Sequence, residues 1–327
     1  MVPELKKNIL ATLAYYDIFD FPLKAEEIFA RLIVFKHLNS SEVSKPCSYV
    51  EIKKELDQLF IEQIVSCVDG YYFLFDREYL LPLRLKREKI AARKWHMARR
   101  TVRWLRLIPY VRAIFASGSL AMNNTDELSD LDVLVVTKYD RIWLNRFLIL
   151  GTLFLLGMRR RGTDRIAPDK ICTNHFVTER SLNIPFKSIY NAQTYANLIP
   201  IYLKNAEIVS EFMKENGWVL DYSYYWNIKN CIETKRRLTS NLSGTCEIIL
   251  NTKFGDWLEY SAQKYQSKRI ANNPATHQAG GRVVFNNLQL EFHPHSIEAR
   301  TVLAYNERLN SLGLSEFAIE KDSGLTR

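Results

Sequence analysis

Ser117-Gly118-Ser119 is followed, after ten further residues, by Asp130-Leu131-Asp132 and the apolar run Val133-Leu134-Val135-Val136. Successive residues of a β-strand point to opposite faces, so Asp130 and Asp132 are expected on the same side of a strand. Two neighbouring carboxylates repel each other and lose solvation energy when buried, and a bound divalent cation offsets both costs. The four apolar residues that follow predict a strand buried on both faces.

The turn before this strand completes the pattern. Residues 111–116 form a short apolar run that predicts an earlier strand. Gly118 has no side chain, so backbone N–H groups around it can approach a phosphate closely. Ser119 adds a hydroxyl donor and is expected to open a helix over residues 120–123, whose N-terminus favours anions. The stretch therefore predicts a cradle for a triphosphate beside a metal-binding pair of carboxylates.

Gly118-Ser119 and Asp130-x-Asp132, at this spacing and with these apolar flanks, resemble the signature of the nucleotidyltransferase superfamily typified by DNA polymerase beta. The resemblance covers about residues 109–180. It implies transfer of a nucleoside monophosphate from a nucleoside triphosphate to an acceptor. It also implies that Asp130 and Asp132 hold Mg²⁺ or Mn²⁺, and that Gly118 and Ser119 bind the outer phosphates.

Members of that superfamily usually carry a third carboxylate on a later strand. The next expected strand, residues 170–177, contains no Asp or Glu. Asp169 lies at its edge, and Asn174 and His175 lie within it. An Asn side chain can bind a metal through its amide oxygen but cannot take a proton, whereas His can. Asn174 is the catalytic candidate beside Asp130 and Asp132, and which of these groups fills the third position stays open.

Composition and cysteine usage indicate an ordinary globular protein. The 327 residues suggest two or three domains, and 47% apolar with 25% charged residues is typical of globular proteins. The first residues are polar and charged, without an apolar signal segment. The five widely spaced cysteines, with no Cys-x-x-Cys pair, indicate reduced thiols of a cytoplasmic protein. The apolar run over 147–158 is too short to span a membrane and predicts a buried helix that covers the core sheet.

Positive charge is concentrated in one segment. Residues 81–112 hold eleven Lys and Arg residues and a single acid, Glu88, and they predict one long, irregularly amphipathic helix. The basic residues within 84–112 could attract RNA, DNA or the nucleotide itself. The alternative is a solvated helix face that partly packs along its aliphatic stems.

The expected fold class is α/β (α+β), with a small mixed-sheet nucleotidyltransferase core between an N-terminal winged helix and a C-terminal helical domain. Helices up to residue 17 and over 23–33, a third helix opened by a capping box at Ser48 and Glu51, and a hairpin around Asp69-Gly70 resemble a winged helix-turn-helix. The segment 36–47 is expected to be a mobile loop. Further helices are expected over 189–199, 206–216, 251–268 and 296–312, with a hairpin over 281–292. The predicted divisions are 1–80 (winged helix-turn-helix-like), 81–108 (basic linker helix), 109–182 (core), 183–270 (helical) and 271–327 (hairpin and helix extension).

These observations favour a magnesium-dependent nucleotidyltransferase whose acceptor stays open between RNA, a protein side chain and a small metabolite. One alternative is a non-catalytic nucleotide-binding protein, or a winged-helix regulator or adaptor, and the lack of a third carboxylate favours it. Acids outnumber bases on the third expected helix, so protein interaction or packing is favoured there over DNA binding. A metal-dependent glycosyltransferase is disfavoured by the short core and by the Gly-Ser spacing.

Overall fold

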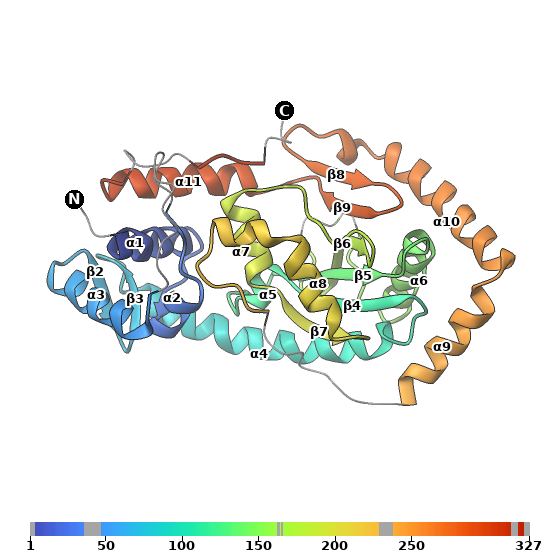
Figure 1. The fold of residues 1–327 in the computed structure, drawn as a ribbon, viewed down its shortest axis with the longest axis horizontal. Coiled ribbons are helices and arrows are strands. Elements are labelled where there is room, and N and C mark those ends of the chain that lie inside the picture. The colour runs from blue at the N-terminus through green and yellow to red at the C-terminus, as the bar shows by residue number, and fades with distance from the viewer. Residues whose placement is uncertain are drawn as a thin grey trace.

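The structure is a computed structural model that describes residues 4–35, 47–161, 164, 166–228, 238–314 and 320–323. Within these residues the chain has a mixed α/β fold, with a small three-stranded sheet and a six-stranded mixed sheet (Figure 1). Residues 36–46, where a loop was expected, and Cys231 lie outside the described residues. Cys47, Cys67, Cys172 and Cys246 are free thiols.

The N-terminal elements are helices around the small sheet. They are α1 (Glu4–Asp17), β1 (Leu23–Lys24), α2 (Ala25–Ala30), α3 (Tyr49–Ile61), β2 (Val65–Val68) and β3 (Tyr71–Leu74). The expected capping box is confirmed, because Ser48 Oγ accepts the backbone N–H of Glu51 at 3.2 Å. The helix expected over 23–33 is wrong at both ends, since Leu23 and Lys24 pair with β3 as a strand and the helix covers only α2. The hairpin of β2 and β3 around Asp69-Gly70 is confirmed.

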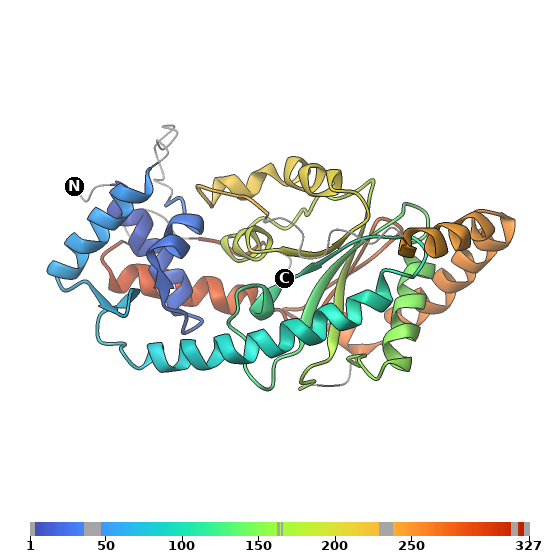
Figure 2. The ribbon, with the colours of Figure 1, turned by 90° about the horizontal axis from the view of Figure 1, so that it is seen from below.

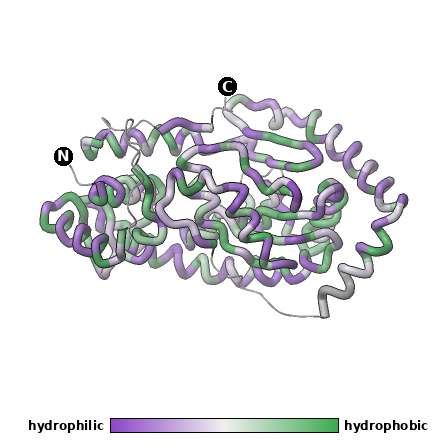
Figure 3. The backbone as a smooth tube through the Cα atoms, viewed as in Figure 1, coloured by the Kyte–Doolittle hydropathy of each residue, from purple (hydrophilic) through white to green (hydrophobic). Residues whose placement is uncertain are grey.

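The long basic helix is confirmed as α4 (Leu80–Leu105). It runs along one side of the molecule from the N-terminal elements to the large sheet (Figure 2). Polar and apolar residues alternate along its length (Figure 3), and Ala98, Val102 and Leu105 are buried on its sheet-facing side. The helix leads directly into the first strand of the large sheet.

The large sheet has the strand order β7-β4-β5-β6-β9-β8, in which β5 and β6 are parallel and the other pairs are antiparallel. Its strands are β4 (Val111–Ala116), β5 (Leu131–Thr137), β6 (Ile171–Thr178), β7 (Ile199–Leu203), β8 (Arg282–Phe285) and β9 (Gln289–His293). The sheet therefore extends beyond the expected core of 109–182. The hairpin expected over 281–292 is confirmed as β8 and β9, and it joins this sheet.

The helix expected over 189–199 is too long. It ends at Ala196 as α7 (Ile189–Ala196), and β7 follows it after a short turn. Pro200 lies within β7, which is an edge strand, and a proline is tolerated there because one side of the strand needs no backbone donor. Ile201, fully buried, fixes this strand against the core.

Helices cover both faces of the large sheet (Figure 2). One face packs on α4, α6 (Ile142–Leu155) and α10 (Lys253–Ala271). The other face packs on α7, α8 (Glu207–Glu215) and the 3₁₀ turn η1 (Gly217–Asp221). The remaining elements are α5 (Gly118–Ala121), α9 (Leu238–Leu250), η2 (Pro274–His277) and α11 (Glu298–Ser311).

The apolar helix expected over 147–158 begins earlier, as α6, and is buried on one face only. Phe147, Phe154 and Leu155 are exposed, the last with 84% of its surface accessible. Across the described residues, we find no helix with the length and apolar character needed to cross a membrane.

The last helix packs against the first. Val302, Tyr305 and Leu309 of α11 lie in the same apolar core as α1, and the rings of Tyr305 and Tyr15 are 5.7 Å apart. Arg308 of α11 also donates to Asp17 at the end of α1 at 2.8 Å. The N-terminal elements therefore share their core with the C-terminal helix, and Figure 1 shows α11 beside α1.

Candidate functional site

The glycine turn lies against the second aspartate. The backbone N–H of Ser117 donates to the carbonyl oxygen of Asp132 at 3.0 Å, which aligns the end of β4 with the start of β5. Gly118 has a φ of +60°, and a Cβ added to it would lie 2.7 Å from Oδ2 of Asp132. A side chain here would force the carboxylate of Asp132 to shift, so both the conformation and the size of this position favour glycine.

Asp130 and Asp132 lie together with the thiol of Cys172. Ligand atoms of the three residues are all within 4.8 Å of one another. Cys172 is opposite Asp132 in the parallel pair of β5 and β6, which explains the contact. Within the residues that the structure describes, this group holds no third carboxylate.

Arg160, in the connection from α6 to β6, reaches the same group. It forms an ion pair with Asp130, and its Nη1 donates to Cys172 Sγ at 3.3 Å. A pocket of about 210 Å³ opens here and is lined in part by Ser129, Asp130 and Arg160. The carboxylates therefore face a protein cation beside an accessible space.

Asn174 also contacts the pair. Its Nδ2 donates to Oδ1 of Asp132 at 3.0 Å, so it orients that carboxylate through its amide. The register of β5 and β6 shifts just beyond this point, where Thr173 and Asn174 together oppose Val133. Asn174 is thus the one of the three candidates for the third position that touches Asp132.

The two other candidates for the third position, His175 and Asp169, do not contact Asp132 in any hydrogen bond that the described residues form. His175 is buried, with Nδ1 3.4 Å from the hydroxyl of Tyr195 and Nε2 3.0 Å from the amide nitrogen of Gln289. Burial, and then the nearby His293 and Arg282, lower its pKa well below the usual value, so it is neutral. Asp169 accepts from Lys94 at 2.7 Å.

The electrostatics of the group disfavour two charged carboxylates at this place. Burial, and then the charge of Asp130, raise the pKa of Asp132 to about 7, although Arg160, Cys172 and Asn174 act in the opposite direction. Burial and the two carboxylates raise the pKa of the Cys172 thiol well above its usual value. A protonated thiol leaves carboxylate oxygens as the ligands, and these fit a hard cation such as Mg²⁺ or Mn²⁺.

The segment before Asp130 is held from both sides. Lys94 of α4 is fully buried, and its Nζ donates to the carbonyl oxygen of Ser129 at 2.6 Å. Oδ1 of Asp126 accepts the backbone N–H groups of Leu128 and Ser129 at 2.9 and 2.8 Å. These bonds fix where Asp130 enters β5.

Cys172, Arg160 and Lys94 lie at the site but were not among its predicted residues. Cys172 could have been found, because it shares the strand face of Asn174 by alternation. Arg160 lies in a connection without periodicity, and Lys94 is one of many basic residues on α4, so neither carries a local signal.

Several basic residues of α4 act within the protein. Arg84 pairs with Glu27 and Glu88, Arg93 pairs with Glu127, and Lys94 pairs with Asp169. Arg87 donates to the carbonyl oxygens of Phe19 and Asp20. Lys86, Lys89 and Arg100 are exposed. The charge that α4 presents to solvent is therefore smaller than its composition indicates.

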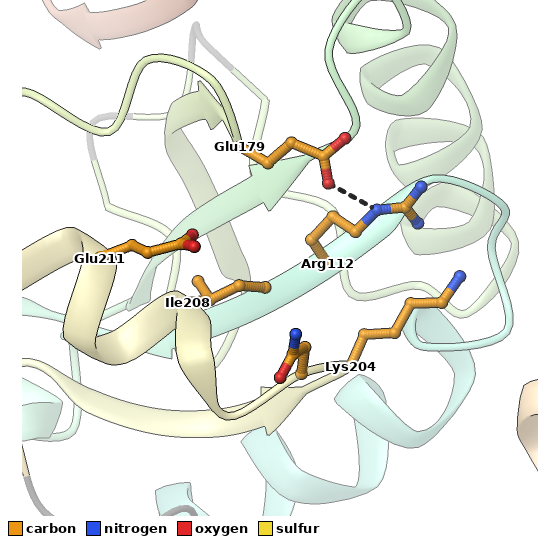
Figure 4. Close-up of a pocket in the computed structure, with 6 residues that line it drawn as sticks. Arg112, Glu179, Lys204, Ile208 and Glu211 are labelled. Atoms are coloured by element: carbon orange, nitrogen blue, oxygen red, sulfur yellow. Dashed lines mark hydrogen bonds and ion pairs between the residues drawn. The ribbon is translucent and has the colours of Figure 1, made fainter.

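A larger pocket of about 520 Å³ lies at the opposite end of the sheet (Figure 4). Arg112, at the start of β4, and Lys204, just after β7, supply its cations. Both pair with Glu247, and Arg112 also pairs with Glu179. Because carboxylates already neutralise these cations, the pocket suits an anionic ligand less well than its size indicates.

Comparison with known proteins adds no assignment, since no protein-family model, curated protein sequence or solved structure matches the chain.

Proposed function

We propose that this protein is a nucleotidyltransferase, which moves a nucleoside monophosphate from a nucleoside triphosphate to an acceptor. The observation that carries the proposal is the contact of Gly118 with Asp132, where a glycine turn meets a partly buried carboxylate. A glycine at this contact leaves backbone N–H groups of the turn accessible to phosphate oxygens next to the carboxylates.

Each residue of the site has a role in this proposal. Asp130 and Asp132 would hold Mg²⁺ or Mn²⁺, which, when bound, neutralises phosphate charge and aligns the attacking and leaving oxygens. Gly118 and Ser119 would bind the outer phosphates. Asn174 orients Asp132 through its amide. Arg160 pairs with Asp130, so the cation has to compete with this guanidinium.

The finer architecture is part of the same proposal. We assign residues 1–80 to a winged helix-turn-helix-like unit, supported by the order of α1, α2, α3 and the hairpin of β2 and β3. The helices α7 and α8 belong to the predicted helical division, 183–270, and they cover the sheet face that carries Asp132. The free thiols among the described residues favour a cytoplasmic location.

The acceptor is a hydroxyl of RNA, a protein side chain or a small metabolite. The exposed Lys86, Lys89 and Arg100 on α4 favour nucleic acid, because phosphate contacts from such residues dominate its binding.

A second function is favoured by a specific observation. The ion pair of Arg160 with Asp130, in a group that lacks a third carboxylate among the described residues, suits a protein that binds nucleotide without turnover. Such a protein would act as a regulator or adaptor.

The test is thermal unfolding with each of the four nucleoside triphosphates, with and without Mg²⁺, for the wild type and for Asp130→Asn/Asp132→Asn. We expect one nucleotide to raise the melting temperature only with Mg²⁺, and the double variant to lose this rise. Asp57→Asn, which removes an exposed carboxylate on α3 away from the pair, is the control and should keep it. The absence of any nucleotide-dependent shift would rule out the proposed site.

A measurement of turnover distinguishes the nucleotidyltransferase from the non-catalytic regulator or adaptor. Pyrophosphate release with the bound nucleotide, measured with RNA, protein and small hydroxyl acceptors, is expected with one acceptor class. Binding without release in all three series would favour the regulator or adaptor.

A further inference from the structure

Arg159 and Arg160 point to opposite faces of the large sheet. Arg159 is bridged to Ile171 at the start of β6, so this connection runs beside the sheet like a short strand. Neighbouring residues of an extended chain alternate in direction. Arg160 reaches Asp130, whereas Ile171, the bridge partner of Arg159, packs into the core beneath α6 and α10. Arg159 is therefore directed to the face that these two helices cover.

Two further arginines approach Arg159 on that face. Arg146 comes from α6 and Arg269 from the last turn of α10, and α6 and α10 pack on each other. Burial, and then the charges of Arg159 and Arg269, lower the pKa of Arg146 to about 10. Burial, and then Arg269 and Arg161, lower the pKa of Arg159. We call Arg146, Arg159 and Arg269 the arginine cluster.

Among the described residues, no acid neutralises the arginine cluster. In the part of the chain that the structure describes, none of its three members forms an ion pair with a carboxylate. Their partners are neutral: Arg146 bonds to Gln266 and lies 4.6 Å from the ring centroid of Phe292, and Arg269 bonds to the hydroxyl of Tyr265. Arginines elsewhere in the fold, such as Arg84 and Arg282, do pair with carboxylates.

Two donors of the cluster are also unused. Nε of Arg146 and Nε of Arg159 are buried and have no acceptor among the described residues. A buried donor without an acceptor is costly, and like charges in a partly buried place repel strongly. An anion with several oxygens would remove both costs at once.

We propose that the arginine cluster binds a phosphate group, on the sheet face opposite Asp130 and Asp132. Guanidinium groups from three separate elements converge here, and they match the several oxygens of a phosphate, which accepts paired N–H donors. The phosphate belongs either to a small anion, such as inorganic phosphate, or to a nucleic-acid backbone. This site does not depend on the proposed transferase activity, because it uses none of the residues that contact the carboxylates.

The test is the melting temperature at low ionic strength in buffer freed of divalent cations, with and without inorganic phosphate. We expect phosphate at about ten times its dissociation constant to raise the melting temperature of the wild type by about 2–4 °C. Arg159→Gln and Arg269→Gln should lose this rise. Without phosphate, Arg159→Gln should melt above the wild type, since a repulsive charge is removed.

Arg300→Gln is the matched control, because Arg300 is exposed on α11, away from the cluster. It should keep the rise with phosphate. A rise that persists in both cluster variants, a lower melting temperature of Arg159→Gln without phosphate, or no rise in the wild type would each overturn the proposal.

A short RNA oligonucleotide distinguishes the two sources of phosphate. If RNA acts at a far lower concentration than inorganic phosphate, and Arg269→Gln weakens RNA binding, the source is a nucleic-acid backbone. If Arg269→Gln abolishes the response to inorganic phosphate but leaves RNA binding unchanged, the source is a small anion.

Discussion

The surroundings of Asp132 disfavour the ionised form of its carboxyl group. Its pKa of about 7 lies above the unfolded value of about 3.9, so the unfolded chain releases this proton at lower pH than the folded protein. The group therefore lowers the free energy of unfolding as pH rises from about 4 to 7. In buffer without divalent cations, Asp132→Asn should gain about 1–2 kcal/mol relative to the wild type over this interval. Urea denaturation at pH 5 and pH 7.5 measures the difference.

Asp126 should respond in the opposite direction. Although burial raises its pKa, bonds from the Ser129 hydroxyl and from the N–H groups of Ser129 and Leu128 hold it below the usual value. Because Asp126 is exposed and solvent screens these interactions, Asp126→Asn should destabilise the protein by less than about 1 kcal/mol at neutral pH, measured by the same urea denaturation. For Asp132→Asn, a gain in the free energy of unfolding that is the same at pH 5 and at pH 7.5 would contradict the raised pKa of Asp132 as its cause.

A comparison of Gly118 with Gly157 separates the cost of a positive φ from the cost of steric crowding by an added Cβ. Both have positive φ, +60° and +66°, but an added Cβ meets Asp132 only at Gly118 and meets nothing within 4 Å at Gly157. Each alanine variant should lose about 1 kcal/mol from its backbone conformation. Gly118→Ala should lose about 1–3 kcal/mol more and its response to nucleotide with Mg²⁺. Equal melting temperatures for the two variants would mean that the turn does not press against the carboxylate.

At the scale of elements, Glu247 joins α9 to the large sheet. It accepts from the backbone N–H of Tyr110, from Arg112 and from Lys204, at 2.9, 2.9 and 2.8 Å. Although burial acts in the opposite direction, these partners lower its pKa to about 2. A lowered pKa stabilises the fold above the unfolded value of about 4.3, and the contribution is lost as pH falls towards 2.

Glu247→Gln should therefore cost about 1–2 kcal/mol at pH 7 and progressively less between pH 5 and pH 2. Denaturant titrations of both proteins across that range measure the difference. A cost that stays constant with pH would show that the glutamate acts through packing alone.

Strong local patterns predicted several elements, among them the two strands that hold the candidate site. The apolar runs of β4 and β5, the capping box of α3 and the long basic helix all have a local cause, and the structure contains each of them. Because alternation along β5 is local, the common face of Asp130 and Asp132 could also be predicted. The contact of Asp132 with Gly118 required only that the two strands pair.

Elements defined by distant partners could not be predicted in the same way. The two-residue strand β1 forms because it pairs with β3. The strand β7 forms because it pairs with β4 at the edge of the large sheet. The register shift in β6, which separates Asn174 from His175 in function, has no sequence signal. Arg160 reaches Asp130 through a connection whose path depends on the packing of α6.

At the scale of the whole molecule, α11 completes the N-terminal core. Tyr305 is buried between α11 and α1, and Leu303 on the same helix is 64% exposed. Tyr305→Ala should destabilise the protein by about 3 kcal/mol and speed amide hydrogen exchange in α1. Leu303→Ala should change stability by less than about 0.5 kcal/mol. Unchanged exchange in α1 for Tyr305→Ala would mean that the N-terminal elements hold together without α11.

The packing of α11 on α1 also sets an order of events during synthesis. The ribosome makes α1 before α11, and Tyr305, Leu309 and Leu314 of the same core follow about 290 residues after α1. At about 5–20 residues per second, the nascent chain waits about 15 to 60 seconds between the two. Throughout that time the apolar surface of α1 lacks its final cover, which makes this surface a place on the nascent chain where a holding chaperone would bind.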